Sequence, residues 1–153
     1  MTDVVDKATR SRMMSGIGAK NTAPELRLRL ILHRHGFRYR LHQADLPGKP
    51  DIVLKKYRTV VFVHGCFWHC HECAMFKWPA SNRDFWRKKI SRNRIRDEKQ
   101  IVELIGMGWR VLTVWECALR GPNAQADGMV LKHFQRWIFS RLDRKELSGK
   151  MGK

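Results

Sequence analysis

The stretch GKPDIVLKKYRTVVFVH, residues 48–64, decides the fold of this chain. It holds two β-branched runs, DIVL at 51–54 and TVVFVH at 59–64, separated by the polar residues KKYR. Such runs predict two strands, and the alternation of apolar and polar residues in FRYRLH at 37–42 predicts a third. The intervening QADLPGKP at 43–50 has the composition of a turn, so we expect three consecutive strands.

Helical patterns flank these strands. Residues 21–36 carry the start signals of a helix, with Thr22 as N-cap and Pro24 in the first turn, and they close on a glycine. Apolar residues embedded in charge predict a long helix within 82–108 whose exposed face is strongly basic.

The C-terminal third predicts three further segments. They are a buried strand at 109–115, a loop at 116–125 and a final amphipathic helix at 129–142. The order α, β, β, β, α, β, α places a helix between the last two strands, as a crossover requires. We therefore expect an α/β domain with a mixed central sheet flanked by helices.

A single domain spanning 1–153 fits a chain of 153 residues of which 43% are hydrophobic. The basic residues 1–20 predict a flexible N-terminal arm that is free to reach around a ligand. Residues 143–153 are expected to form a flexible tail.

The charge predicts a polyanionic partner. There are 31 Lys and Arg against 14 Asp and Glu, giving a formal charge of +17 and a pI near 10.5. Nucleic acid is the usual partner of such a chain. Because the basic residues are spread along the sequence, a membrane-surface protein is disfavoured. We expect a cytoplasmic protein, since neither a membrane span nor a signal peptide stands out.

Asp51 is the first candidate for catalysis. It follows Pro50 at the start of one predicted strand, and the next strand ends at His64. Hydrolysis of a phosphodiester needs a neutralised phosphate and an activated water, which Mg²⁺ held by one or two carboxylates supplies. An aspartate after a proline also caps turns, so a metal ligand and a turn residue are both open at this point.

The segment GCFWHCHEC, residues 65–73, offers more metal ligands than one zinc ion uses. The candidates are Cys66, His69, Cys70, His71 and Cys73, with Cys117 from a distant loop. In a reducing compartment such cysteines favour a metal site, and a closed zinc site takes four ligands. The C-x₂-C spacing of Cys70 and Cys73 is the first choice for one pair, and a surplus histidine is free to act as a general base.

Bulky aromatic residues lie within this segment and shortly after it. They are Phe67, Trp68, Phe76, Trp78, Phe85 and Trp86. Aromatic side chains on a basic surface enter between base pairs and unstack them. A small hydrophobic cluster over the loop is the alternative, and it weighs more for Phe76, Trp78 and Phe85. Met14 in the arm is a further candidate for insertion, with ordinary packing as its alternative.

Four motifs resemble the very-short-patch-repair (Vsr) mismatch endonucleases of bacteria. They are DKATRSRMMSGIGAKNT (6–22), LPGKPDIV (46–53), FVHGCFWHCHECAMFKWPA (62–80) and GWRVLTVWECALRG (108–121). The resemblance runs in collinear order over roughly residues 5–138. It implies a restriction-endonuclease-like core of the PD-(D/E)XK type, with Pro50 and Asp51 as the Pro-Asp pair. Residues 62–64 replace the usual acidic-x-Lys strand.

The resemblance also implies an activity. Family members nick one strand of duplex DNA 5′ to the thymine of a T·G mismatch, left by deamination of 5-methylcytosine, and the hydrolysis depends on Mg²⁺. The implied partners are double-stranded DNA carrying the mismatch, contacted by the arm, and a mismatch-repair partner protein. We expect a monomer associated with the bacterial nucleoid. The alternatives are a zinc-stabilised DNA-binding module without catalysis and a nuclease for another DNA lesion.

Catalytic roles follow from the resemblance residue by residue. Asp51 would bind Mg²⁺ with the backbone carbonyl of Val63, and His69 would act as general base or orient the attacking water. Supporting roles fall to Glu25, His64 and Asp97. The first two would hydrogen-bond water on the ion, and Asp97 would support His69. A capping box with Thr22 is the alternative for Glu25, and an exposed ion pair is the alternative for Asp97.

The resemblance assigns the remaining candidates to zinc and to DNA. The structural zinc would take Cys66, His71, Cys73 and Cys117, and the intercalating side chains would be Phe67, Trp68, Trp86 and Met14. The chain departs from the family at Val63, where a small polar residue is expected, and at Cys70, where histidine is expected. We prefer Cys66 to Cys70 as the zinc ligand. Cys70 is adjacent to His69, and the residues beside His69 must direct the His69 side chain toward Asp51 and away from zinc.

Overall fold

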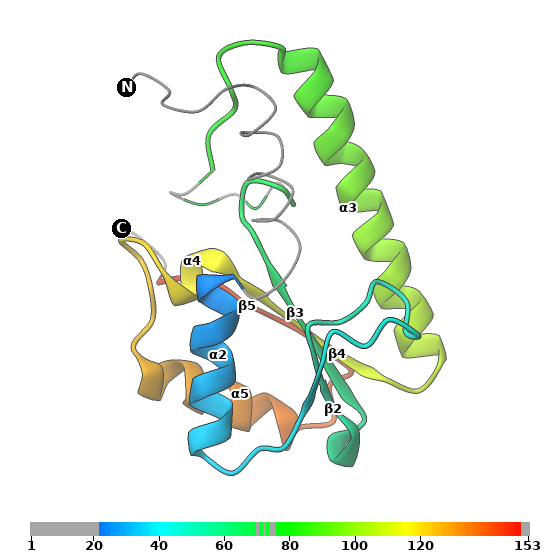
Figure 1. Ribbon diagram of the computed structural model, residues 1–153, viewed down its shortest axis with the longest axis vertical. Helices are drawn as coiled ribbons and strands as arrows, with labels where there is room; N and C mark the ends of the chain where they lie inside the picture. The colour runs from blue at the N-terminus through cyan, green and yellow to red at the C-terminus, as the bar shows by residue number, and fades with distance from the viewer. Residues whose placement is uncertain (1–21, 70, 72, 74–75, 151–153) are drawn as a thin grey trace.

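The computed structural model describes residues 22–69, 71, 73 and 76–150 (Figure 1). The arm expected at 1–20, including Met14, lies outside the described residues, as does Cys70. Among the described helices, none is both long enough and apolar enough to cross a membrane.

A mixed sheet forms the centre of the molecule, as predicted, and it has five strands where the sequence predicted four. Its strands in spatial order are β1 (Arg40–Leu41), β2 (Ile52–Leu54), β3 (Thr59–His64), β4 (Arg110–Trp115) and β5 (Arg144–Leu147). The pairs β1–β2 and β2–β3 are antiparallel, whereas β3–β4 and β4–β5 are parallel. The parallel β3–β4 pair requires the crossover that the long helix α3 (Arg83–Gly106) provides.

Helices cover both faces of this sheet (Figure 1). One face packs on α2 (Ala23–Arg34), α4 (Glu116–Leu119) and α5 (Asp127–Ile138) through a core that includes Leu28, Val61 and Phe134. The other face packs on α3 through a core that includes Val60, Phe62, Ile101 and Leu104. Val60 and Val61 enter opposite cores because successive side chains in a strand point to opposite faces.

Four predicted boundaries are wrong, each because tertiary packing prevails over local pattern. Of the strand predicted at 37–42, only Arg40–Leu41 pairs, while Phe37 packs edge-on against Phe134 at a ring-centroid distance of 4.9 Å. The loop predicted at 116–125 begins with α4, whose Ala118 and Leu119 are buried. The final helix covers 127–138 instead of 129–142.

The fourth correction concerns the C-terminal end. Residues 144–147 form the edge strand β5, so the tail expected from residue 143 does not begin there. Three of the four residues in β5 are exposed and only Leu147 is buried, which explains why its polar composition resembles a tail.

Candidate active site and metal centre

Asp51 immediately precedes β2 and lies beside Val63, the penultimate residue of β3. Its Oδ2 accepts a hydrogen bond from the backbone N–H of Val63 at 2.7 Å. Burial and, after it, the negative charge of Glu25 raise the pKa of Asp51 to about 7, although the Val63 hydrogen bond works in the opposite direction. The site therefore favours a proton or a cation at this carboxylate.

Glu25 brings a second carboxylate to the same place from α2. Its backbone N–H donates to Oγ1 of the N-cap Thr22 at 3.4 Å, so the predicted cap is present. Its side chain is 2% exposed, and its Oε2 lies 2.9 Å from Nη1 of Arg29 and 2.8 Å from Nε2 of His42. Ligand atoms of Glu25, His42 and Asp51 lie within 4.8 Å of one another. This group is one of those that could hold a metal ion.

A pair of stacked histidines lines the same cavity as the two carboxylates. His64 ends β3 and His69 follows in the next loop, and their rings are parallel within 4° with centroids 3.8 Å apart. Nδ1 of His69 contacts the Oδ2 of Asp97, which α3 supplies. Burial, followed by the neighbouring His69, lowers the pKa of His64 to about 3, so His64 is neutral at physiological pH.

One cavity of about 420 Å³ collects all five predicted catalytic residues. It is lined by Glu25, Asp51, His64, His69 and Asp97, together with Val63, Thr22, Gly48, Lys49, Phe62, Arg96 and Gln100. The carboxylates come from α2 and the approach to β2, and the histidines come from the end of β3 and its loop. The cations Lys49 and Arg96 add positive charge that suits a phosphate. The cavity therefore combines two carboxylates, the neutral imidazole of His64 and two cationic side chains that attract an anion.

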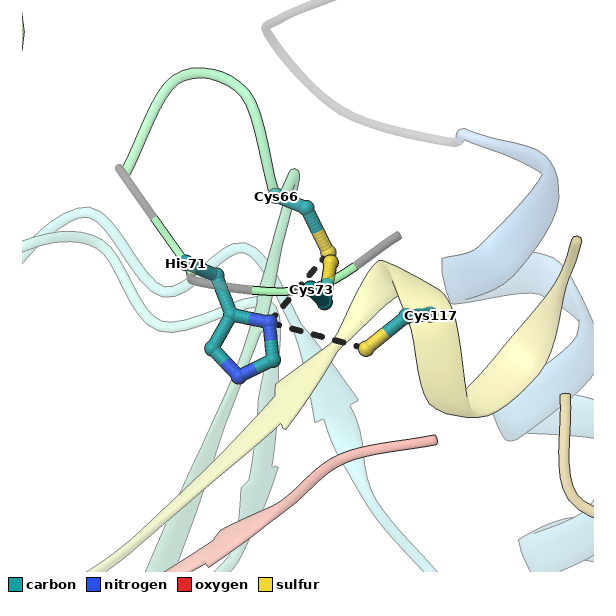
Figure 2. A group of neighbouring side chains, drawn as sticks. All are labelled: Cys66, His71, Cys73 and Cys117. Carbon is teal, nitrogen blue, oxygen red and sulfur yellow. Dashed lines mark hydrogen bonds between the residues drawn. The ribbon is translucent and has the colours of Figure 1, made fainter. Parts of the chain in front are cut away.

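A second cluster lies at the ends of β3 and β4. Ligand atoms of Cys66, His71, Cys73 and Cys117 all lie within 4.8 Å of one another (Figure 2). The Nδ1 of His71 is 3.6 Å from the Sγ of Cys66 and 3.5 Å from the Sγ of Cys117. These are the four residues expected to bind zinc, and the cluster could hold a metal ion. Burial raises the pKa of both the Cys66 and the Cys117 thiols, so thiolates here require a cation.

Trp115 at the end of β4 stands between the two clusters. The ring of His71 stacks on it at 4.2 Å, and the ring of His64 meets its edge at 5.5 Å. Its Nε1 donates to Oε1 of Glu146 in β5 at 2.9 Å. The Cys/His cluster and the histidine pair therefore both contact the ring of Trp115.

The predicted intercalating residues within the described part of the chain form one aromatic group. Phe67 meets Trp68 at 5.1 Å and Trp86 at 5.4 Å between ring centroids, and each of the three is partly exposed. Asn93 of α3 donates to the backbone carbonyl of Trp68 at 2.9 Å, and Nζ of Lys89 lies 5.7 Å from the Trp68 ring. Aromatic surface and positive charge are thus adjacent at the start of α3.

Sequence reasoning missed His42, Arg29, Trp115 and Glu146. His42 occupies the residue after β1, where strand pairing alone brings it to Asp51, so no local spacing announces it. A sequence signal for Arg29 does exist: it lies four residues after Glu25 on one helix, a spacing that predicts an ion pair. Trp115 and Glu146 meet through the β4–β5 pairing, which the sequence did not reveal.

A strongly basic chain whose mixed sheet brings two carboxylates and a histidine–aspartate pair to one cavity favours the class of enzymes that cleave nucleic acid. The family model described as DNA mismatch endonuclease Vsr matches residues 2–75. The chain is 49% identical over 138 residues to the DNA mismatch endonuclease Vsr of Escherichia coli, covering 90% of this chain and 88% of that protein. This protein belongs to the Vsr family of DNA mismatch endonucleases.

Two further relatives have names that specify strand nicking. The type II nicking enzyme V.XorIIP of Xanthomonas oryzae pv. oryzae is 48% identical, covering 81% of this chain and 91% of that enzyme. The type II nicking enzyme V.NmeAIP of Neisseria meningitidis is 49% identical, covering 78% and 86%. The resemblance found in the sequence motifs is confirmed, and the family implies a restriction-endonuclease-like fold for the mixed sheet.

Proposed function

We propose that this endonuclease nicks one strand of duplex DNA 5′ to the thymine of a T·G mismatch, by Mg²⁺-dependent hydrolysis of the phosphodiester. The observation that carries the proposal is the single cavity in which Asp51 and Glu25 face His64, His69 and Asp97. Names of the relatives support mismatch-directed cleavage and nicking.

The donor chemistry of the acidic group fits Mg²⁺. Magnesium prefers oxygen ligands and is commonly bound by one or two carboxylates, which Asp51 and Glu25 offer within one group. Asp51 and the backbone carbonyl of Val63 would hold the ion, and the hydrogen bond between Asp51 and Val63 supports this by placing the two residues side by side. When bound, Mg²⁺ neutralises phosphate charge and helps to activate water.

His69 is the proposed general base. Its contact with Asp97 holds the hydrogen on Nδ1, which leaves Nε2 with a lone pair for the proton of the attacking water. The neutral ring of His64, stacked beside it, fixes the plane of His69 without adding a like charge. Asp97 and His64 are therefore positioning residues in this proposal.

The second cluster is proposed to bind a structural zinc ion. Three thiols and one imidazole are the ligand types of a closed tetrahedral site, and the chain supplies them as Cys66, His71, Cys73 and Cys117. The site joins the loop after β3 to α4, and it would hold the intervening segment in shape.

Phe67, Trp68 and Trp86 are proposed to enter the DNA stack from the major-groove side, with Met14 from the minor-groove side. Partly exposed aromatic rings beside Lys89 are the combination that unstacks bases on a polyanion. We also propose that the protein acts as a monomer in the bacterial cytoplasm at the nucleoid, and that a mismatch-repair protein assists it.

The test is nicking of labelled duplexes that differ in one base pair. With Mg²⁺, we expect a break in one strand, 5′ to the thymine, for T·G and much less cutting for T·A and C·G. Asp51→Ala and His69→Ala should lower the nicking rate by at least about a hundredfold while DNA affinity stays within a few-fold. The exposed Asp45 and His33 provide the matched controls Asp45→Ala and His33→Ala, which should behave like wild type.

Different failures of this test have different meanings. Absence of a break in every duplex would overturn the enzymatic proposal and leave a DNA-binding module. Equal cutting of matched and mismatched duplexes would remove the mismatch specificity. Cutting at another lesion in preference to T·G would replace the substrate.

A further inference from the structure

We propose that His42 is a positioning residue for the carboxylate pair, and that it sets the affinity of the site for the catalytic cation by holding Glu25 against Asp51. This inference rests on the proposed function, because it assigns a cation to that pair. It adds a residue for which sequence motifs suggested no role.

The backbone of His42 is fixed to the Asp51 strand. Leu41 pairs with Ile52, and the next N–H along the chain, that of His42, donates to the carbonyl of Asp51 at 3.1 Å. At this point His42 has a φ of 46°, in the left-handed region that residues other than glycine occupy rarely. A strained backbone conformation beside two carboxylates suggests that the direction of the His42 side chain has a function.

The side chain of His42 reaches the other carboxylate. Its Nε2 lies 2.8 Å from Oε2 of Glu25, and the side chain is 22% exposed against 2% for Glu25. Because a carboxylate oxygen accepts, the ring carries its hydrogen on Nε2 and donates. His42 thus binds Asp51 through its backbone and Glu25 through its ring, and it joins α2 to the β1–β2 edge of the sheet.

Glu25 needs such a partner. A carboxylate that is 2% exposed and shares its site with a second carboxylate is stable there only if donors hold it. Arg29 donates to Oε2 of Glu25 from one turn further along the same helix, so this hydrogen bond does not tie the carboxylate to the sheet. His42 donates from the sheet side. A small, rigid cation such as Mg²⁺ tolerates little error in the placement of its oxygen ligands.

Two substitutions separate the backbone of His42 from its ring. Asparagine tolerates the left-handed conformation but is too short to reach Glu25, whereas glutamine keeps an N–H donor at nearly the length of the histidine. We expect His42→Asn to raise the Mg²⁺ concentration for half-maximal nicking of a T·G duplex by about 10-fold to 100-fold, the usual effect of losing a residue that orients a metal ligand. His42→Gln should stay within about threefold of wild type, as should the control His33→Asn.

A second readout tests positioning without relying on nicking. Binding of Mn²⁺ to the protein, followed by electron paramagnetic resonance in the absence of DNA, should weaken in His42→Asn by a similar factor as Mg²⁺ activation does. If His42 were itself a ligand, its imidazole would favour Mn²⁺ over Mg²⁺, and the substitution would weaken Mn²⁺ disproportionately. That result would overturn the positioning role.

The two measurements also keep this inference distinct from the proposed function. Nicking and Mn²⁺ binding that are both unchanged in His42→Asn would overturn the role of His42 and leave the endonuclease intact. Wild-type protein that does not nick, but whose Mn²⁺ binding weakens on His42→Asn and is restored in His42→Gln, would support the role of His42 while the proposed function fails.

Discussion

Burial of the Asp51 carboxylate carries an electrostatic cost in the protein without Mg²⁺. The pKa of Asp51 is about 7 in the fold, against an ordinary value of 3.8 for an aspartate. The unfolded chain releases this proton at lower pH, so the stability that protonated Asp51 contributes is complete below about pH 4 and is lost as the pH rises through about 7.

The substitution Asp51→Asn should therefore stabilise the Mg²⁺-free protein at pH 8. The asparagine oxygen still accepts from the N–H of Val63, while the buried charge is gone. We expect a gain of about 1 to 4 kcal/mol in the free energy of unfolding, measured with urea, and almost none at pH 4. Nicking should be lost. A destabilised variant at pH 8, or an equal gain at both pH values, would show that the charge is not the cause.

Residue by residue, the sequence predicted the candidates whose positions are fixed by short spacing. Cys66, His69, His71 and Cys73 lie within one loop, and the strand after Pro50 brings Asp51 beside β3. His42 was out of reach because its role depends on the pairing of β1 with β2 and on a left-handed backbone, neither of which a local pattern contains. Roles that depend on long-range pairing therefore require coordinates.

Among the elements, β4 and α5 are joined by one arginine. The guanidinium of Arg110 donates to the backbone carbonyls of Trp137, Ile138, Ser140 and Leu142, with distances from 2.7 to 3.1 Å. Its Cζ also lies 4.4 Å from the centroid of the Trp137 ring. A cation at the carboxyl end of a helix satisfies carbonyls that lack partners within the helix.

Loss of this arginine should destabilise the fold without affecting the chemistry. We expect Arg110→Ala to cost about 2 to 4 kcal/mol in urea unfolding and Arg110→Lys about half as much, because lysine keeps the charge but not the forked donors. Arg110 lines neither of the two cavities that border His64 and His69, so the nicking rate at 25 °C should be unchanged. The exposed Arg34 gives the control Arg34→Ala. A drop in nicking rate with unchanged stability would contradict this assignment.

The elements that the sequence predicted well are those with strong periodic patterns. The β-branched runs correctly predicted β2, β3 and β4, and the capping and glycine signals correctly predicted α2 and α3. The missed elements are short or polar. In β5 only Leu147 faces a core, and α4 is a single turn whose helical state depends on burial of Ala118 and Leu119. Neither carries enough apolar periodicity to be recognised without its neighbours.

Across the whole molecule, the Cys/His cluster connects the proposed catalytic cavity to the strands of the sheet. Cys66 follows β3 and Cys117 lies in α4 directly after β4, so a bound ion would tie together the ends of two central parallel strands. The chain end also reaches this place, where the N–H of Gly149 donates to the Sγ of Cys117 at 3.3 Å. From His71 the contact continues through Trp115 to His64 and His69. Loosening of the cluster should therefore disturb the histidine pair.

Metal removal tests whether the Cys/His cluster supports the pair His64 and His69. A structural zinc contributes on the order of 10 kcal/mol of apparent binding free energy to a fold, so its loss should be easy to detect. We expect Cys66→Ser and Cys117→Ser to lose zinc in metal analysis, to lower the Tm by more than about 10 °C, and to nick at least about tenfold more slowly even with saturating Mg²⁺. Cys70→Ser is the matched control and should keep its full zinc content. Mild chelation of wild type should have the same effect as Cys66→Ser, and added Zn²⁺, but not Mg²⁺, should reverse it. If Cys70→Ser loses zinc while Cys66→Ser retains it, Cys70 is the ligand, and the loop must bind the ion with His69 held differently relative to Asp51.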